Sequence, residues 1–519
     1  MSTLSVAFTG LGGKLAAHVL LSASALALGL LLALPLAVWS SRSPRVAALS
    51  LGFASLVQTI PGLALLALFY PLLVSLGALT GLSIPALGFL PALMALTLYA
   101  LLPILRNAVT ARERMDREVL EAADALGMTS WQKLRHVEIP LALPYIVAGI
   151  RTAAVWTVGA ATLATMVGQP SLGDPIFAGL QIQNWSLVLA GCSLAAALAL
   201  AVDALIGQIE AGLIALQKGR MLVAGGAILA GLLACILAVS WPGQGDRPRV
   251  VIGAKNFSEQ FILARLIGQR LEADGYRVEY RDGLGSSVAY KALATGQIDT
   301  YVDYSGTLWA SEMHRTDRVS RDATLSAISD WARTSGGVKL IGALGFENAY
   351  AFAMRTERAR SLGIASLDDL ARQSSKLTLG TDLEFLSRPE WKAVHQAYGL
   401  DFAATRSFAP SLMYNALVSG DADVISAFSS DGRIAADGLV LLSDPRQSLP
   451  GYDALLLVSG KASQDPRLLR LLQPLAGAIG VEQMRIANYS VDRTANKLSP
   501  EAAARLLGCS TRLGPCPAK

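Results

Sequence analysis

The sequence predicts an all-α transmembrane bundle followed by an α/β domain of two lobes. Six apolar segments, each long enough to cross a bilayer, occupy the first 240 residues. Charged residues make up only 16% of the chain and are concentrated in the second half. In that half, strand and helix patterns alternate, which is typical of sheets covered by helices. One polypeptide therefore combines a membrane part with a soluble part tied to it.

The apolar segments and the basic loops between them set the expected topology. Pro61 interrupts the second segment, which is either one kinked span or two short ones. Lys and Arg favour the cytoplasmic side. All three basic loops lie there only if this segment crosses once, which predicts six spans and an external second half. A retained signal peptide at 221–240 would give the same topology. The segments are 18–40, 46–77, 85–109, 145–167, 184–207 and 221–240, and the basic loops are 40–45, 110–136 and 208–220.

The loop at about 110–143 is predicted to contain two short helices. Residues 118–126 have helical spacing of apolar side chains, and Gly127 is expected to end this helix. A second helix is expected over 131–137, ended by Pro140. An ordinary amphipathic connector is the alternative, although loops of this length are uncommon without a function.

This loop resembles the signature of importer-type ABC permeases. The resemblance rests on Glu121-Ala122-Ala123, then Gly127, and after nine residues on Val137-Glu138-Ile139-Pro140. It implies that the loop forms coupling helices that dock on an ATPase subunit, with Glu121, Ala122, Ala123 and Gly127 as the coupling residues. The chain has no phosphate-binding G-x-x-x-x-G-K-[ST] motif. The ATPase is therefore expected to be a separate polypeptide, so that ATP acts through the partner and this chain has no catalytic residue or cofactor.

The second half is predicted to form parallel sheets with helices on both faces. Ligands of such sheets bind at the carboxyl ends of the strands. The length fits two lobes with a cleft between them, the second lobe at about 344–440. Expected strands are 250–253, 278–280, 343–345, 376–380, 423–428 and 439–442.

Aromatic residues recur at the ends of these strands, outside the helical core stripes. Several aromatic faces around one point form a cage for a quaternary ammonium, which donates no strong hydrogen bond. A Lys and an Arg nearby would hold a carboxylate. The alternative for any single tyrosine is a core residue with its hydroxyl satisfied.

This half resembles the binding proteins of glycine betaine, choline and carnitine ABC importers. The resemblance rests on Lys255–Gln260 (Lys-Asn-Phe-Ser-Glu-Gln), the Tyr304–Thr307 turn, Ala427–Arg433 and Pro450-Gly451-Tyr452. It implies an aromatic cage of Tyr304, Tyr350, Phe428 and Tyr452, and a carboxylate site of Lys255, Thr307 and Arg388. Phe428 replaces the usual tyrosine and keeps the aromatic face. Glu347, where relatives often have Asn, is expected near a second polar group of a larger ligand, which makes ergothioneine a candidate.

The favoured hypothesis is a fused permease and binding domain of an ABC importer in the bacterial plasma (inner) membrane. Its expected partners are two copies of an ABC ATPase, a second copy of this chain, membrane lipid and a small quaternary amine. Composition gives no indication of nucleic acid or metal binding.

A tethered ligand sensor would need fewer spans and a signalling domain, and an external enzyme would need a catalytic cluster. Whether Cys509 and Cys516 form a disulfide is left open. Expected parts are a permease domain at 1–220, a further span at 221–241, a linker at 242–249 and a binding domain at 250–519.

Overall fold

The computed structural model describes residues 8, 11–40, 43–82, 84–182, 184–240, 247–315, 317, 319–449, 451–493, 495–514 and 516. The chain forms two compact units, residues 1–177 with 186–245 and residues 178–185 with 246–519. Most of the predicted linker, and Pro450 of the predicted ligand motif, lie outside the described residues. An all-α unit of apolar helices and an α/β unit of two lobes confirm the predicted fold class.

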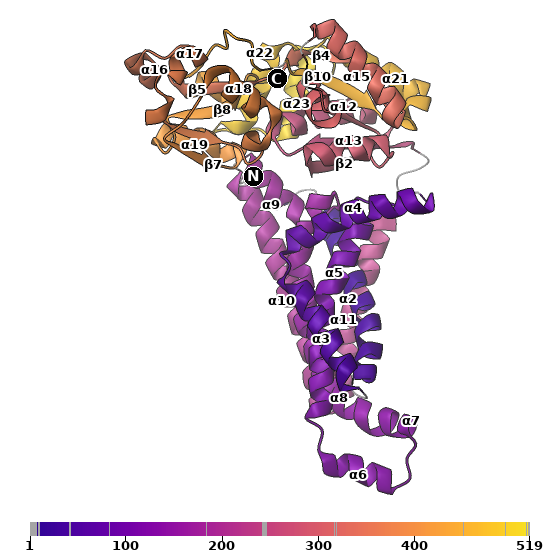
Figure 1. The fold of residues 1–519 in the computed structure, drawn as a ribbon. Coiled ribbons are helices and arrows are strands. Elements are labelled where there is room, and N and C mark those ends of the chain that lie inside the picture. The colour runs from indigo at the N-terminus through magenta and orange to yellow at the C-terminus, as the bar shows by residue number, and fades with distance from the viewer. Residues whose placement is uncertain are drawn as a thin grey trace. The chain divides into compact units, whose positions relative to one another are not determined.

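The first unit is a bundle of long apolar helices (Figure 1). Among the described residues, five helices are long and apolar enough to cross a membrane, or six spans if a bent pair counts as one. The helices are α2 (Gly12–Ser40), α3 (Pro44–Thr59), α4 (Gly62–Thr80), α5 (Phe89–Glu113), α6 (Arg117–Ala125), α7 (Ser130–Lys133), α8 (Ile139–Ala160), α9 (Gly173–Gln181), α10 (Trp185–Ile214) and α11 (Lys218–Ser240).

The segment with the predicted break forms the bent pair. Helix α3 ends at Thr59, Pro61 precedes α4, and the two helices meet at 102°. Proline lacks an amide hydrogen and clashes with the preceding turn, which favours a break at this point, although α2, α4, α5 and α8 each continue through a proline. In Figure 1, α4 lies across the end of the bundle, whereas α3 runs along it.

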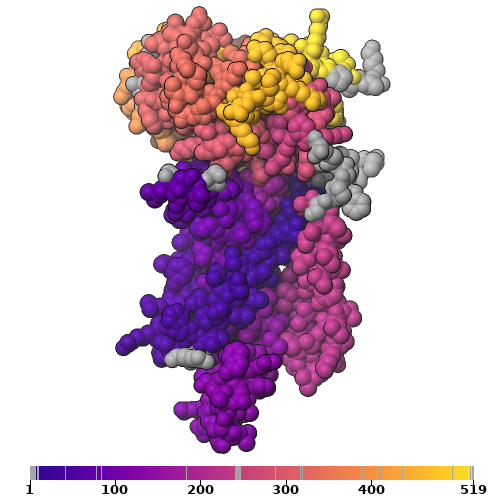
Figure 2. Space-filling view, turned by 90° about the vertical axis from the view of Figure 1, so that its right-hand side faces the viewer, coloured from indigo at the N-terminus to yellow at the C-terminus, as the bar shows by residue number. Residues whose placement is uncertain are grey.

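The loop between α5 and α8 protrudes from the other end of the bundle (Figures 1 and 2). The prediction that Pro140 ends a separate helix is wrong. Instead, α7 continues through a π-helical turn, Leu134–Glu138, into α8, and Pro140 stands in the first turn of α8. The wider turn satisfies the amide of Ile139 with the carbonyl of Leu134, so the helix accommodates the proline ring without a break.

Two ion pairs hold this loop together. Arg112 at the end of α5 pairs with Glu138 at 2.7 Å, and Glu138 is 8% exposed. Lys133 pairs with Asp124 at 2.7 Å, which ties α7 to α6. The first pair closes the base of the loop, and the second fixes the angle between its two helices.

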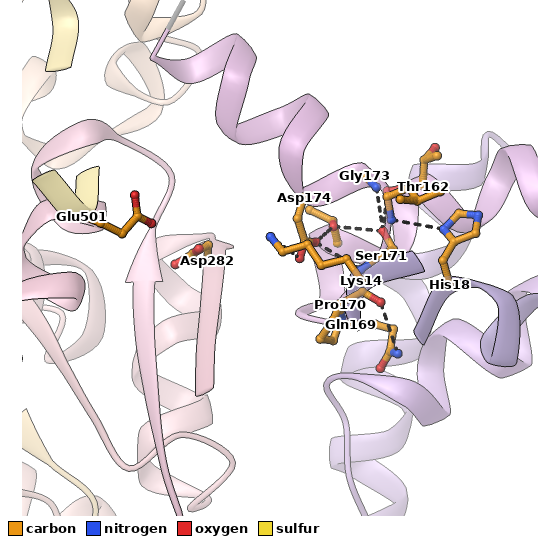
Figure 3. Close-up of polar contacts among 12 residues, drawn as sticks. Lys14, His18, Thr162, Gln169, Pro170, Ser171, Gly173, Asp174, Asp282 and Glu501 are labelled. Carbon is orange, nitrogen blue, oxygen red and sulfur yellow. Dashed lines mark hydrogen bonds and ion pairs between the residues drawn. The ribbon is translucent and has the colours of Figure 1, made fainter. Parts of the chain in front are cut away.

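At the opposite end of the bundle, buried polar groups join α2 to the segment before α9 (Figure 3). The His18 ring bonds to the carbonyl of Val158 at 3.0 Å and to the amide of Leu172 at 3.3 Å. Lys14 pairs with Asp174 at 3.1 Å, and Asp174 also accepts from Thr165. Backbone that leaves the helix after the 3₁₀ turn Ala161–Val167 is thereby supplied with partners.

The α/β unit contains two five-stranded sheets, one per lobe. Their strand orders are β2-β1-β3-β10-β4 and β7-β6-β8-β5-β9. The strands are β1 (Arg249–Lys255), β2 (Arg277–Leu284), β3 (Thr300–Tyr304), β4 (Lys339–Glu347), β5 (Tyr350–Arg355), β6 (Thr378–Thr381), β7 (Ala404–Ser407), β8 (Val424–Phe428), β9 (Leu439–Leu441) and β10 (Asp453–Val458).

The sheets are mixed, so the prediction of purely parallel sheets is wrong. Strand β10 runs antiparallel to β3 and β4, and β5 runs antiparallel to β8 and β9. The chain crosses between lobes after β4 and again before β10. Each crossing delivers a strand to the new sheet from the cleft side, which reverses its direction. These are the strands that bring Tyr350 and Tyr452 to the cleft.

Helices cover both sheets. In the first lobe they are α12 (Ser258–Ala273), α13 (Ser286–Ala294), α14 (Ser305–Thr307), α15 (Arg321–Gly336), α21 (Pro466–Leu472), α22 (Val481–Asp492) and α23 (Pro500–Ser510). In the second lobe they are α16 (Thr356–Leu362), α17 (Leu367–Ala371), α18 (Pro389–Tyr398), α19 (Pro410–Ser419) and α20 (Arg433–Ala436). A disulfide joins Cys509, in α23, to Cys516.

Small residues let the bundle helices pack closely, which gives a first prediction. A Cβ at Gly149 in α8 would lie 2.8 Å from the Asn107 Cβ and 2.9 Å from the Pro103 carbonyl oxygen in α5, whereas Gly159 in α8 has open space. We expect Gly149→Ala to destabilise the chain by about 1–3 kcal/mol through overpacking. Gly159→Ala should be neutral or stabilising. Thermal unfolding in detergent measures both, and equal melting temperatures would contradict this packing.

Candidate ligand-binding site

Aromatic rings from both lobes form one connected group in the α/β unit. The Tyr350 ring lies 4.9 Å from the Phe428 ring and 5.7 Å from the Tyr452 ring, between centroids. Phe257 links this set to Tyr304, at 6.3 Å from Phe428 and 6.1 Å from Tyr304. The structure thus brings together all four residues of the predicted cage. Sequence analysis did not assign Phe257 to it, although the motif Lys255-Asn256-Phe257 drew attention to that turn.

The ends of the strands position these rings. Tyr304 is the last residue of β3, Phe428 is the last residue of β8, and Tyr452 directly precedes β10. Tyr350 begins β5 and pairs with Phe428 across the antiparallel ladder. Such cross-strand neighbours lie within contact distance, so their rings meet. The sheets therefore fix the cluster through backbone register.

Arg388 lies at the edge of the aromatic group. Its guanidinium carbon is 5.4 Å from the Tyr350 ring centroid, and Nη2 is 3.5 Å from the Thr307 hydroxyl of the other lobe. Nε donates to Glu390 at 3.1 Å, and Glu390 also accepts from the Tyr452 hydroxyl. Burial, reinforced by the Glu390 charge, raises the pKa of Tyr452, so its hydroxyl stays protonated and donates. A ligand carboxylate would share Arg388 with Glu390.

Lys255 and Glu347 lie in different surroundings from those expected. Lys255 is buried and pairs with Asp303, with its Nζ 5.5 Å from the Tyr304 ring centroid. Its charge is therefore compensated by the protein. Glu347 is exposed at the end of β4, where it pairs with Asp453 in the strand ladder.

A buried carboxylate connects the aromatic group with both lobes. Glu259 accepts from the Tyr304 hydroxyl at 2.6 Å, the Asn348 amide at 3.0 Å and the Asn488 amide at 2.9 Å. The same Asn488 amide donates at 2.9 Å to the carbonyl of Ser430, which follows β8 in the second lobe. Burial raises the pKa of Glu259, while these donors oppose the rise. Glu259 belongs to the motif Lys255–Gln260, but no role was predicted for it, because a glutamate in the first turn of a helix reads as an ordinary helix start.

A cavity of about 50 Å³ adjoins the cluster, lined among others by Phe257, Glu259, Asn348, Phe428 and Asn488. This volume accommodates small numbers of water molecules. Among the described residues, no group of three or more His, Cys, Asp or Glu side chains is placed to hold a metal ion.

The predicted coupling residues lie together on the loop between α5 and α8. Glu121 and Ala122 are exposed on α6, and Ala123 is buried against the loop. Gly127 has φ +74°, in the left-handed region that favours glycine, and a Cβ there would meet open space. The requirement for glycine is thus conformational.

Both halves of the chain match known protein families. Residues 25–215 match the family described as binding-protein-dependent transport system inner membrane component. Residues 248–506 match the substrate binding domain of ABC-type glycine betaine transport system.

Individual relatives cover one half or both. The chain is 28% identical to an ergothioneine transport permease/ergothioneine binding protein of Helicobacter pylori (strain G27), over 90% of this chain and 84% of that protein. It is 39% identical to a glycine betaine/carnitine/choline transport system permease protein of Bacillus subtilis (strain 168), over 38% of this chain and 85% of that protein. A solved glycine betaine/carnitine/choline ABC transporter structure is 27% identical, with a TM-score of 0.45, over 51% of this chain and 99% of that one.

The bonds of Glu259 give a second prediction. Glu259→Ala leaves three buried donors without their acceptor and opens a cavity. We expect the free energy of unfolding of the α/β unit to fall by about 3 kcal/mol. Glu272→Ala, at an exposed position of the same helix, should change it by less than about 0.5 kcal/mol. Denaturant unfolding followed by fluorescence checks both variants, and equal stability of the two would show that Glu259 holds nothing together.

Proposed function

Because the chain belongs to the glycine betaine/carnitine/choline family of binding-protein-dependent ABC importers, we propose that it imports a quaternary ammonium compound. It is the membrane subunit of an ATP-driven importer, and its permease and binding domain share one chain. The observation that supports this substrate class is the connected group of Tyr304, Tyr350, Phe428 and Tyr452 beside Arg388.

The chemistry of this group suits a cation without hydrogen-bond donors. A trimethylammonium group is attracted to aromatic faces within about 6 Å of each ring centroid. Rings from both lobes surround such a cation when the lobes close on it, so binding and closure are coupled. Arg388 and Thr307 hold a carboxylate on the same ligand through charge-assisted and neutral hydrogen bonds. Glycine betaine, carnitine and ergothioneine carry both groups, whereas choline carries only the cation.

Ergothioneine is the second candidate. It is favoured by the relative of Helicobacter pylori, whose similarity extends over both halves of the chain. Its imidazole ring would need room beyond the trimethylammonium and carboxylate. Glu347, exposed at the end of β4, is the proposed contact for that ring.

The loop between α5 and α8 serves as the docking site of a separate ATPase in this proposal. It presents apolar side chains to solvent: Val119 is 41%, Leu126 77% and Trp131 65% exposed. Exposed apolar patches mark interaction sites. Two ATPase subunits and two copies of this chain would form the working importer.

We place the binding domain on the extracytoplasmic side of the bacterial plasma membrane. The disulfide of Cys509 and Cys516 supports this side, because such bonds persist in oxidising compartments. A tethered sensor is disfavoured by the number of membrane-spanning helices, which a simple anchor does not need.

Loss of one ring of the cage tests the substrate class. We expect Tyr350→Ala to weaken binding of the transported compound by more than about 1 kcal/mol, roughly fivefold in Kd. Tyr350→Phe keeps the aromatic face and should bind within about twofold. Calorimetry on the full-length chain in detergent, with glycine betaine, choline, carnitine and ergothioneine, measures this. Failure of the unaltered chain to bind any of the four would reject the proposed substrate class.

Changes in the docking loop test the coupling role. Glu121→Lys reverses an exposed charge in the motif, and Gly127→Val forces a β-branched residue to adopt φ +74°. Both should reduce uptake in cells by more than about tenfold and leave ligand affinity unchanged. Glu113→Lys, an exposed acid just outside the motif, is the matched control and should transport normally. Normal uptake by both motif variants would remove the coupling assignment.

A further inference from the structure

Arg151 of α8 and Asp203 of α10 are charged side chains within long apolar helices of the bundle, and Glu210 lies nearer the end of α10. Arg151 of α8 forms a two-point ion pair with Asp203 of α10, at 2.6 and 2.7 Å. A third bond, at 3.3 Å, runs from Arg151 to Glu210. At 1.5 Å per residue, Arg151 lies about 18 Å along α8 from its start, and Asp203 about 16 Å from the end of α10. The pair is thus near the middle of both helices.

The sequence of α10 prepares this arrangement. Asp203, Gly207 and Glu210 are spaced by four and three residues, so they share one face of the helix. Gly207 leaves room for the guanidinium, since a Cβ there would lie 3.3 Å from its central carbon. Arg151 therefore lies across the glycine between the two acids.

These charges do not face lipid, because ionised groups inside a bilayer are costly and face protein or water. In the single chain, the side chains of Arg151, Asp203 and Glu210 remain 40%, 34% and 23% exposed. A hollow of about 360 Å³ lies over them, and Thr152 and Trp156 also line it. A volume of this size is typical of small-ligand sites.

The hollow combines the groups that a zwitterionic quaternary amine requires. Its net charge is −1, from one guanidinium and two carboxylates, and the Trp156 side chain is 56% exposed. An indole face and carboxylates attract a trimethylammonium group, and the guanidinium binds a carboxylate in two-point fashion. The cage in the α/β unit uses the same two kinds of contact.

We infer that Arg151, Asp203, Glu210 and Trp156 form a second substrate site, which holds the zwitterion in transit through the permease. The inference rests on the proposed function. The ligand carboxylate displaces Asp203 from Arg151, and the released acid then faces the trimethylammonium group together with Glu210 and Trp156. The site exchanges one ion pair for another, so its net charge of −1 does not change when the zwitterion binds.

Swapping the charges of Arg151 and Asp203 between α8 and α10 distinguishes a substrate site from an ion pair that only holds the two helices together. Uptake of labelled glycine betaine, carnitine and ergothioneine is measured in cells that make the full chain with its ATPase. The variants are then compared in uptake of the compound that the unaltered chain imports. Arg151→Gln should reduce uptake more than tenfold, with ligand affinity of the full chain unchanged. The double variant Arg151→Asp with Asp203→Arg restores a salt bridge but moves the guanidinium to the other helix, so uptake should stay low.

Full recovery of uptake in the double variant would overturn the transit site, because a structural clamp needs only the pair. Normal uptake by Arg151→Gln would overturn it as well. Arg220→Gln, which removes an arginine of α11 that bonds to Gln208 outside the hollow, is the matched control and should transport normally. If the unaltered chain imports none of the three compounds, the proposed function itself fails, which is a different result from loss in the variants alone.

Discussion

The α/β unit depends on a carboxylate held away from water. Glu259 draws the Tyr304 hydroxyl and two asparagine amides to one point, and Asn488 extends the connection to the carbonyl of Ser430. Isolated burial of a charge is unfavourable, so the arrangement is stable only while all of these donors remain in place. The same residue that orients one ring of the aromatic group is therefore also connected to the second lobe.

The aromatic group shows how binding energy is linked to movement. Its rings are supplied by both lobes and contact one another, and Phe257 and Phe428 also line a cavity of about 50 Å³. Ring-to-ring contacts are exchanged for ring-to-cation contacts when the ligand enters. Arg388 is likewise held by Glu390 and Thr307. Because the protein supplies substitutes for both ligand groups, the net gain on binding is smaller than the sum of the new contacts, which favours release to the permease.

In the membrane bundle, close helix packing and partners for polar groups provide the stability. Glycines such as Gly149 allow helices to approach where no hydrophobic effect drives them together. Irregular backbone near α9 is satisfied by His18, and Lys14 is paired with Asp174. These polar groups thus lie where the backbone is not helical or, as with Arg151 and Asp203, where a side chain of opposite charge is in contact. A transport path needs such groups.

The sequence by itself determined the kind of fold and the identity of most site residues. In a bilayer, the backbone N–H and C=O groups of a run of about 20 apolar residues find their hydrogen-bond partners when the run forms a helix. The aromatic residues of the cage and Gly127 could be picked out because their chemistry and the family motifs mark them. Only the tertiary structure decided which groups meet. The mixed direction of β5 and β10, the helix that continues past Pro140, and the compensation of Lys255 by Asp303 all depend on contacts between distant segments. Periodicity and local spacing report which face of an element is buried, but they do not report what lies against that face.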